Sequence, residues 1–404
     1  MIYKKRITAI IICFIFLLSA CGNSSNTDKL IDAPSDTIVD NEDLTPEIVA
    51  DNNNSQPDVS QVDGSIEEVE NYLENMTISK EERVIELNLP EDAILIADSE
   101  DAIIYRVYNT VDGLIETDFY RYDKGNQTSE LIYKVKSTFG VVFSEYFNGR
   151  LLVAEWDETS RITLVEMEKV ETLYEYNSSD YPIVKRIGDY LLLEDNIIGG
   201  ENITQKLISI DISTNKIENV DEQIYAQKET GAYISGTRIN HFDGFDNEAI
   251  IEYITYDEKP EENSKNVFWK NYDFESKELK ELCLNIEKAT YQITGTQDII
   301  IYSHYPERTE NSDIGHMLIN QNGSYQEYVI PQIHASAEVN KAELLDNRYV
   351  YLCLNNFDMY VIDLNNLHMD KFGNSNTVNN VLIKCSDDTL AGIVGGNYIS
   401  YLFP

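Results

Sequence analysis

From Arg83 to the C-terminus, short runs rich in Ile, Val, Tyr, Leu and Phe alternate with turns rich in Gly, Asn, Asp and Ser. The clearest runs are AIIYRVYN, RLLVAEW, DYLLLED, AIIEYITYD, DIIIYSHY and RYVYLCL. Runs of this length and composition predict β-strands. The same stretch contains no convincing amphipathic helical window. The pattern therefore predicts an all-β domain over residues 81–404, built as a sandwich, a barrel or a radial repeat.

A repeated strand-turn-strand motif narrows this choice. Four strands end in aspartate: YRYD at Asp123, ISID at Asp211, WKNYD at Asp273 and YVID at Asp363. A polar turn follows each one (KGNQ, ISTN, FESK and LNNL), and another apolar run comes next. An aspartate carboxylate can accept hydrogen bonds from the backbone N–H groups that follow it and so fix a turn. The four aspartates are therefore expected to be structural rather than catalytic.

The motif recurs within units of four strands, at the period that is typical of propeller blades. It resembles the outer hairpins of quinoprotein-like and surface-layer-type β-propellers, and this resemblance concerns the fold more than the family. Two tryptophans, Trp156 and Trp269, are too few for the docked quinone ring of quinoproteins. The expected units are residues 92–136, 139–177, 181–222, 231–285, 289–331, 335–373 and 377–404.

The last unit has only three apolar runs, while Arg83–Leu89 is an extra run ahead of the first unit. An N-terminal strand that completes the last blade would close the ring and remove an open edge. If the extra run supplies the missing fourth strand of the last unit, the sequence predicts seven four-stranded blades. Six or eight blades stay open because the fourth unit is long, and a multi-sheet β-sandwich is the alternative fold.

The N-terminus carries a different signal. Lys4, Lys5 and Arg6 precede the apolar run Ile7–Leu18, which is too short to span a bilayer and has the length of a signal-peptide core. The run ends in LSACG, which resembles the lipobox of bacterial lipoproteins. The resemblance implies that residues 1–20 are a signal peptide and that a diacylglyceryl group on Cys21 anchors the protein. The expected location is the extracellular face of the bacterial cell membrane, with the bilayer as a partner through Cys21.

Residues 21–80 are rich in Asp, Glu, Asn, Ser and Thr, and Tyr72 is their only aromatic residue. Such a composition cannot bury enough apolar surface to offset the entropy of ordering, so an acidic, largely disordered tether is expected. One short helix is predicted within it, over residues 65–76. The sequence SIEE at Ser65 is a capping box, and Ile66, Val69, Leu73 and Met76 recur at helical spacing.

Charge excludes one class of partner. The chain carries 31 basic and 71 acidic side chains, for a net charge of −40. Removing residues 1–20 takes away three of the basic side chains, so the net charge becomes still more negative. Nucleic-acid binding needs a basic face and is not expected. Three cysteines follow Cys21, namely Cys283, Cys353 and Cys385, and an odd number predicts single buried thiols. A Cys353–Cys385 bridge stays open.

Catalytic and cofactor motifs are missing from the sequence. It contains no G-x-S-x-G, HExxH, P-loop, GxGxxG or complete EF-hand. The Asp243–Glu248 turn could offer oxygen ligands to calcium, and an acidic surface turn is the simpler interpretation. No catalytic residue, metal site or cofactor is therefore predicted.

Long loops on a rigid scaffold are where binding residues tend to lie. Long loops are expected between the second and third strands of several blades, at residues 156–161, 193–205, 256–265 and 303–315. All of them should open on one face. The candidate ligand-binding residues on this loop face are Trp156, Arg161, His304, Tyr305, Arg308 and Asp313.

These features together favour a non-enzymatic, membrane-anchored propeller that binds or scaffolds an envelope protein, peptide or glycan. Two alternatives remain. One is a carbohydrate-active hydrolase or lyase that uses carboxylates, Tyr or His on the loop face. The other is a scaffold similar to the propeller lipoproteins that assist membrane-protein insertion, which would expose an apolar patch.

Overall fold

In the computed structural model of the chain, residues 67–404 form a compact unit of their own. The structure describes residues 71–157, 159–166, 169–177, 183–227, 233–256, 265–286, 290–304, 314–334, 339–354, 358–374 and 382–404. Within these residues every helix or strand assigned is a strand, which confirms the predicted all-β class. No helix in this described part is long and apolar enough to cross a membrane. The predicted signal peptide, Cys21 and most of the predicted tether lie outside it.

The strands form consecutive antiparallel meanders, which we call blades 1 to 7, with one eight-stranded sheet counted as two blades. Blades 1 to 3 are made, in order, of β3 (Ile94–Asp98), β4 (Ala102–Val111), β5 (Leu114–Asp123), β6 (Thr128–Ser137); β7 (Gly140–Phe147), β8 (Arg150–Trp156), β9 (Ser160–Glu166), β10 (Lys169–Tyr176); and β11 (Val184–Ile187), β12 (Tyr190–Gly199), β13 (Asn202–Asp211), β14 (Ile217–Gln227).

Blades 4 to 7 continue the same pattern. Their strands are β15 (Tyr233–Phe245), β16 (Glu248–Tyr256), β17 (Lys265–Asp273), β18 (Glu278–Leu282); β19 (Thr290–Gly295), β20 (Ile299–His304), β21 (Ile314–Gln321), β22 (Ser324–His334); β23 (Val339–Leu345), β24 (Tyr349–Leu354), β25 (Asp358–Asp363), β26 (His368–Asn374); and β27 (Ile383–Ser386), β28 (Thr389–Val394), β29 (Asn397–Leu402). Each of the seven predicted units begins and ends within six residues of the observed blade.

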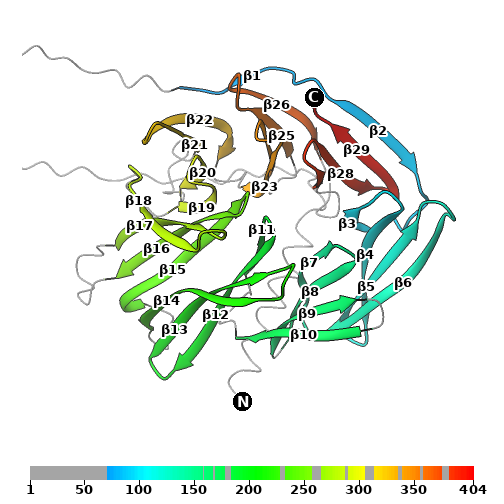
Figure 1. The fold of residues 1–404 in the computed structure, drawn as a ribbon, viewed down its shortest axis with the longest axis horizontal. Helices are drawn as coiled ribbons and strands as arrows, with labels where there is room; N and C mark the ends of the chain where they lie inside the picture. Colours follow the sequence, from blue (N-terminus) through cyan, green and yellow to red (C-terminus); the bar gives the residue numbers. More distant parts are fainter. Residues whose placement is uncertain are drawn as a thin grey trace, which may run out of the picture. The chain divides into compact units, whose positions relative to one another are not determined.

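Blade 7 takes its fourth strand from the N-terminal side of the domain. Strand β2 (Glu81–Glu86) pairs antiparallel with β29, from Glu81 opposite Leu402 to Glu86 opposite Asn397. The predicted closure of the last blade by an N-terminal strand is therefore confirmed. In Figure 1 the sheets follow one another around a ring, with β3, β7, β11 and β23 toward its centre and β6, β10 and β26 toward its rim.

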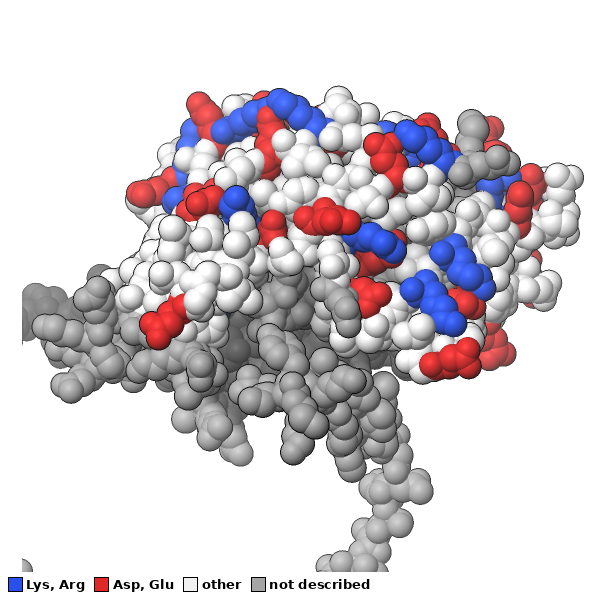
Figure 2. Space-filling view, turned by 90° about the horizontal axis from the view of Figure 1, so that it is seen from below, with Lys and Arg blue, Asp and Glu red and all other residues white. Residues whose placement is uncertain are grey.

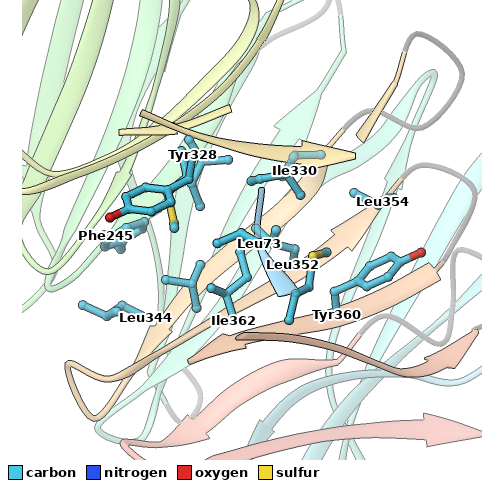
Figure 3. Close-up of a cluster of buried hydrophobic side chains, with 14 residues drawn as sticks. Leu73, Phe245, Tyr328, Ile330, Leu344, Leu352, Leu354, Tyr360 and Ile362 are labelled. Carbon is cyan, nitrogen blue, oxygen red and sulfur yellow. The ribbon is translucent and has the colours of Figure 1, made fainter. Parts of the chain in front are cut away.

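The hydrophobic core is divided among the interfaces between neighbouring blades. In the described residues, seven buried clusters lie between neighbouring blades, and together they run around the whole ring. The cluster between blades 5 and 6 also takes in Phe245 of blade 4. Successive residues on the second strand of a blade enter different clusters. On β4 of blade 1, for example, Ile103 packs toward blade 7 and Ile104 toward blade 2. Because both faces of these strands are buried, their sequences read as continuous apolar runs. Figure 3 shows the cluster between blades 5 and 6.

Residues 71–80 form a segment, which we call the belt, that lies against the outer strands of blades 5 and 6. Val329 N donates to Asn71 O at 2.7 Å, and Leu73 N donates back to Val329 O at 3.2 Å. Strand β1 (Glu74–Asn75) then pairs parallel with β26. The side chain of Leu73 enters the core cluster between blades 5 and 6 (Figure 3), and the side chain of Lys80 forms a 2.7 Å ion pair with Asp370.

The belt corrects the helix predicted over residues 65–76. Residues 65–70 lie outside the described part, and residues 71–76 are extended rather than helical. Hydrogen bonds to distant parts of the chain explain why these residues are extended. The backbone N–H groups of Leu73, Glu74 and Met76 find acceptors on Val329, Leu367 and Met369 of other strands, so no local helical bond is needed.

Blades 3 and 4 merge into one eight-stranded sheet, because β14 and β15 pair at one end, with Tyr225 opposite Gly236. Gly236 has a φ of +99°, and a Cβ placed there would lie 2.5 Å from the carbonyl oxygen of Ile224. Only glycine lets the two strands approach this closely. The two blades are thus joined by backbone hydrogen bonds as well as by side-chain packing.

The four aspartate turns have the geometry that the sequence predicted. The first Oδ of Asp123, Asp211, Asp273 and Asp363 accepts backbone N–H groups two or three residues later, at 2.8–3.0 Å. Each backbone carbonyl also accepts the N–H of the residue four positions on. That residue has a positive φ in all four copies: Gln127, Asn215, Lys277 and Leu367. The aspartates therefore fix the turns between third and fourth strands.

We expect Asp273→Ala to lower the free energy of unfolding by about 1–2 kcal/mol, because two backbone donors lose their acceptor. The hydrogen bond from Ser276 N holds the pKa of Asp273 below its ordinary value of 3.8. A lowered pKa stabilises the fold above the unfolded-state value, and this contribution is lost as the pH falls through the folded-state value. Thermal melts at pH 7 and pH 3 should therefore show a smaller pH dependence in Asp273→Asn, which keeps an acceptor oxygen.

Candidate functional site

Trp156 and Arg161, two of the predicted ligand-binding residues, lie at the end of β8 and near the start of β9. The long loop predicted over residues 156–161 is wrong, because β8 ends at Trp156 and β9 begins at Ser160. The ring of Trp156 stacks on Phe139, with centroids 4.7 Å apart. Arg161 donates from Nε at 3.0 Å and from Nη2 at 2.7 Å to one oxygen of the buried Glu155. The hydrogen bond to Glu155 raises the pKa of Arg161. The guanidinium is thus held by an internal carboxylate.

The other four predicted residues are not brought to this turn within the described part. The backbone of His304 ends β20, and its side chain, like Tyr305, Arg308 and Asp313, lies outside the described residues. Of the loops predicted at residues 256–265 and 303–315, residues 257–264 and 305–313 also lie outside the described part. The interpretation of these residues as a ligand site stays a prediction.

The long loop predicted over residues 193–205 is wrong. The structure continues β12 and β13 through this stretch and joins them by the two residues Gly200 and Glu201. The hairpin is held by backbone pairing as far as Gly199 opposite Asn202. Gly199 and Gly200 thus belong to the tight end of a long hairpin.

The outer end of this hairpin exposes three isoleucines, which we call the blade 3 tip. Ile198 is 62% exposed, Ile224 57% and Ile197 45%. Ile197 of β12 pairs with Thr204 of β13, which pairs with Ile224 of β14, so Ile197 and Ile224 flank Thr204 in a cross-strand row on one face. Ile198, the next residue of β12, lies on the opposite face. The blade 3 tip is therefore an apolar edge on a framework of backbone-paired strands.

Charged residues border the blade 3 tip on the side of the ring. In the row two residues below Ile197 and Ile224, Lys206 forms a 3.6 Å ion pair with Glu222. Asp195 in the same row accepts a 2.8 Å hydrogen bond from the hydroxyl of Tyr174 in blade 2. The apolar edge thus gives way within one row to satisfied polar groups, which is how an interaction patch with a polar rim is built.

The innermost strands bring opposite charges together around the centre of the ring. Lys185 on β11 lies 2.9 Å from Asp243 on β15, and Lys341 lies 3.0 Å from Glu343 on β23. Burial raises the pKa of Glu145, although its partner Arg186 opposes this shift. Opposite charges also mix on the surface, where Figure 2 shows Lys and Arg side chains beside Asp and Glu.

The Asp243–Glu248 turn does not gather its oxygens around a cation position. Asp243 points its carboxylate to Lys185, whereas Glu248 accepts hydrogen bonds from Asn271 Nδ2 and Gln297 N. Asp246 lines a separate polar hollow of about 310 Å3. In the part of the chain that the structure describes, no three His, Cys, Asp or Glu side chains are grouped to hold a metal ion.

The three cysteines that follow Cys21 are free thiols. Cys353 is buried, Cys385 is partly buried and Cys283 is exposed. The bridge between Cys353 and Cys385 that the sequence left open is not formed. Burial raises the pKa of Cys385 to about 12, so this thiol stays protonated at neutral pH.

The strand order and the ring of interfaces define the chain as a β-propeller protein. No protein-family model and no curated protein matches it. Similar solved structures include the β-propeller domain of the Trilobed protease from Pyrococcus furiosus, with 13% identity and a TM-score of 0.44 over 71% of this chain and 85% of that one.

Two further similar structures are YCF48 bound to D1 peptide and an oligogalacturonate lyase from Vibrio parahaemolyticus. The first has 10% identity and a TM-score of 0.46 over 82% of this chain and 98% of that one. The second has 11% identity and a TM-score of 0.45 over 81% of this chain and 98% of that one. At these identities the likeness concerns the fold alone.

Proposed function

We propose that the chain is a lipid-anchored, extracellular β-propeller that docks a protein of the cell envelope on the blade 3 tip. The observation that carries the proposal is the row of exposed isoleucines at the end of β12 and β14. Exposed apolar residues that gather at one edge and are rimmed by polar groups often mark an interaction site. The acylated Cys21 and the acidic tether would hold this edge outside the membrane.

The chemistry of the edge favours a protein over a glycan. Sugar rings are usually bound against aromatic faces, whereas the blade 3 tip is aliphatic. Isoleucine is branched at Cβ and has a restricted χ1 angle, so it loses little rotamer freedom when a partner covers it. The partner should therefore present an apolar surface of its own. Polar groups on the partner should flank that surface and match the row of Asp195, Lys206 and Glu222 next to the tip.

The position of the belt leaves the tip accessible. The belt lies on the outer strands of blades 5 and 6, and two blade boundaries separate blade 3 from blade 5 along the ring. The β14–β15 pairing ties blade 3 to blade 4, so the tip is presented by a rigid sheet. A rigid, preorganised edge lowers the entropic cost of docking.

The test compares two variants of the full chain that carry the same change in charge. Ile224→Glu alters the tip, and Leu131→Glu alters β6 of blade 1, where the leucine is 48% exposed. Each variant is used to recover partners from detergent-solubilised envelope, followed by mass spectrometry and glycan analysis. We expect Ile224→Glu to reduce recovery of a specific protein by roughly tenfold or more and Leu131→Glu to leave it unchanged.

Equal recovery by both variants would contradict docking at the blade 3 tip. Retention of an envelope glycan by both variants, with turnover of that glycan, would instead support the hydrolase or lyase alternative. Retention without turnover would support a glycan-binding module.

A further inference from the structure

Strand β2, which closes the ring, follows directly after the belt in the chain, so it is the first blade strand that tension along the tether would reach. All six of its residues pair with β29, but five of the six side chains are exposed and Ile85 is only partly buried. The pairing therefore depends mainly on backbone hydrogen bonds. If β2 were pulled at Glu81, its first residue, these bonds would open one after another.

The belt, in contrast, is anchored by two buried side chains. Leu73 is 4% exposed and enters the cluster between blades 5 and 6, whereas Ile78 is 7% exposed and enters the cluster between blades 6 and 7. Around Ile78 this second cluster contains Leu345 and Tyr349 of blade 6 and Leu390 of blade 7. The belt is thus fastened on both sides of blade 6, and the four residues between its two anchors are exposed.

The end of the belt that leads into β2 is held by Asp370 on β26. The Oδ2 atom of Asp370 accepts the backbone N–H of Ile78 at 3.1 Å and the ammonium of Lys80 at 2.7 Å. The side chains of Lys80 and Asp370 are only 19% and 13% exposed. Solvent and salt screen such a pair less than an exposed one. The last residue before β2 is therefore fixed to blade 6, independently of the pairing between β2 and β29.

We propose that the belt shields the closure of the ring from tension along the tether, because it holds the chain to blades 5, 6 and 7 more firmly than β2 holds β29. Every attachment from Asn71 to Lys80 has to open before a pull from the N-terminal side reaches Glu81. Such tension arises where the acylated Cys21 is held in a membrane and the blade 3 tip is docked, as proposed above. The attachments of the belt themselves depend on neither.

The test applies a constant force to single molecules of the chain without its predicted signal peptide, in the absence of lipid and partner. One handle is attached at the end of the blade 3 hairpin through a Glu201→Cys substitution, in a chain that also carries Cys283→Ser. Cys353 is buried, and burial raises the pKa of Cys385 to about 12, so neither thiol competes for the handle.

The second handle is attached at one of two points. It is bound either to the thiol of Cys21 or, in a chain that carries Cys21→Ser, at position 79 through Ser79→Cys. Ser79 is an exposed residue that follows both Leu73 and Ile78 in the belt, so a pull from this position bypasses both anchors. Release of β2 is recognised as a step in extension, at most about 3.6 Å for each residue freed.

At the same force, we expect β2 to stay paired at least about tenfold longer in pulls from Cys21 than in pulls from position 79. Leu73→Ala should shorten the lifetime in pulls from Cys21 by about tenfold or more and leave the lifetime in pulls from position 79 unchanged. Thr77→Ala is the matched control, because Thr77 is an exposed residue between the two anchors, and it should change neither lifetime.

Equal lifetimes from the two attachment points would overturn the proposal. A separate short step in which the belt leaves blades 5 and 6 while β2 remains paired would overturn it too, since the belt would then be the weaker attachment. Because no partner and no bilayer are present, these outcomes are independent of whether a protein docks on the blade 3 tip.

Discussion

Leu73→Ala is expected to lower the free energy of unfolding by about 2–5 kcal/mol, as for other buried leucines truncated in a core. Leu73 is the belt residue that enters the cluster between blades 5 and 6, with Ile330 and Leu352 (Figure 3). Met369 belongs to the same cluster. Its loss would leave a cavity where the belt crosses from β22 to β26. Denaturant unfolding followed by circular dichroism measures the change.

Val84→Ala is the matched control, because Val84 lies on the neighbouring strand β2 with most of its side chain exposed. That substitution should change stability by no more than about 0.5 kcal/mol. A Leu73→Ala protein as stable as the Val84→Ala protein would mean that residues 71–80 belong to the tether rather than to the folded domain.

Glu252→Ala is expected to cost about 3 kcal/mol or more, because several buried donors lose one shared acceptor. Glu252 on β16 is fully buried. Its carboxylate accepts hydrogen bonds from Trp269 Nε1 at 3.0 Å, Thr290 N at 2.8 Å and Thr290 Oγ1 at 2.6 Å, and also from Asn240. It thereby fastens the start of β19 in blade 5 to blade 4.

Burial raises the pKa of Glu252, and the hydrogen bonds from Thr290 oppose that shift without cancelling it. A carboxyl group with a raised folded-state pKa keeps its proton longer in the fold than in the unfolded chain. Its contribution to stability therefore declines as the pH rises from the unfolded-state value to the folded-state value. Glu252→Gln should remove this decline and cost less than Glu252→Ala.

Glu278→Ala serves as the control for both variants, since its ion pair with Lys280 is largely exposed. Exposed pairs of this kind contribute about 0–1 kcal/mol. Equal stability curves against pH for the wild-type protein and Glu252→Gln would show that the carboxyl group does not titrate differently in the fold.

The propeller could be predicted because its determinants are local and repeated. The apolar runs, the aspartate turns and the missing fourth strand of the last unit all follow from residue order. In the aspartate turns, for example, Asp211 and the left-handed Asn215 are four residues apart, so one short motif specifies the whole turn. Closure by β2 followed from counting strands rather than from any contact.

The belt and the blade 3 tip could not be predicted in the same way. Leu73 and Met76 have helical spacing, and only the acceptors on distant strands favour an extended chain. Gly199 and Gly200 resemble a loop, and only pairing with β13 shows that the hairpin extends as far as the glycines. Ile197 and Ile198 fall within the loop predicted over residues 193–205, and whether a strand residue is covered depends on neighbours outside its own sequence.

Docking of a protein on the blade 3 tip is tested most directly by site-specific photo-crosslinking in the intact envelope. A photoreactive side chain is placed at position 197 in one full-length protein and at position 131 in another. The account predicts one discrete crosslinked protein from position 197 and none from position 131. The same crosslinked product from both positions, or none from position 197 while the protein is anchored and folded, would contradict it.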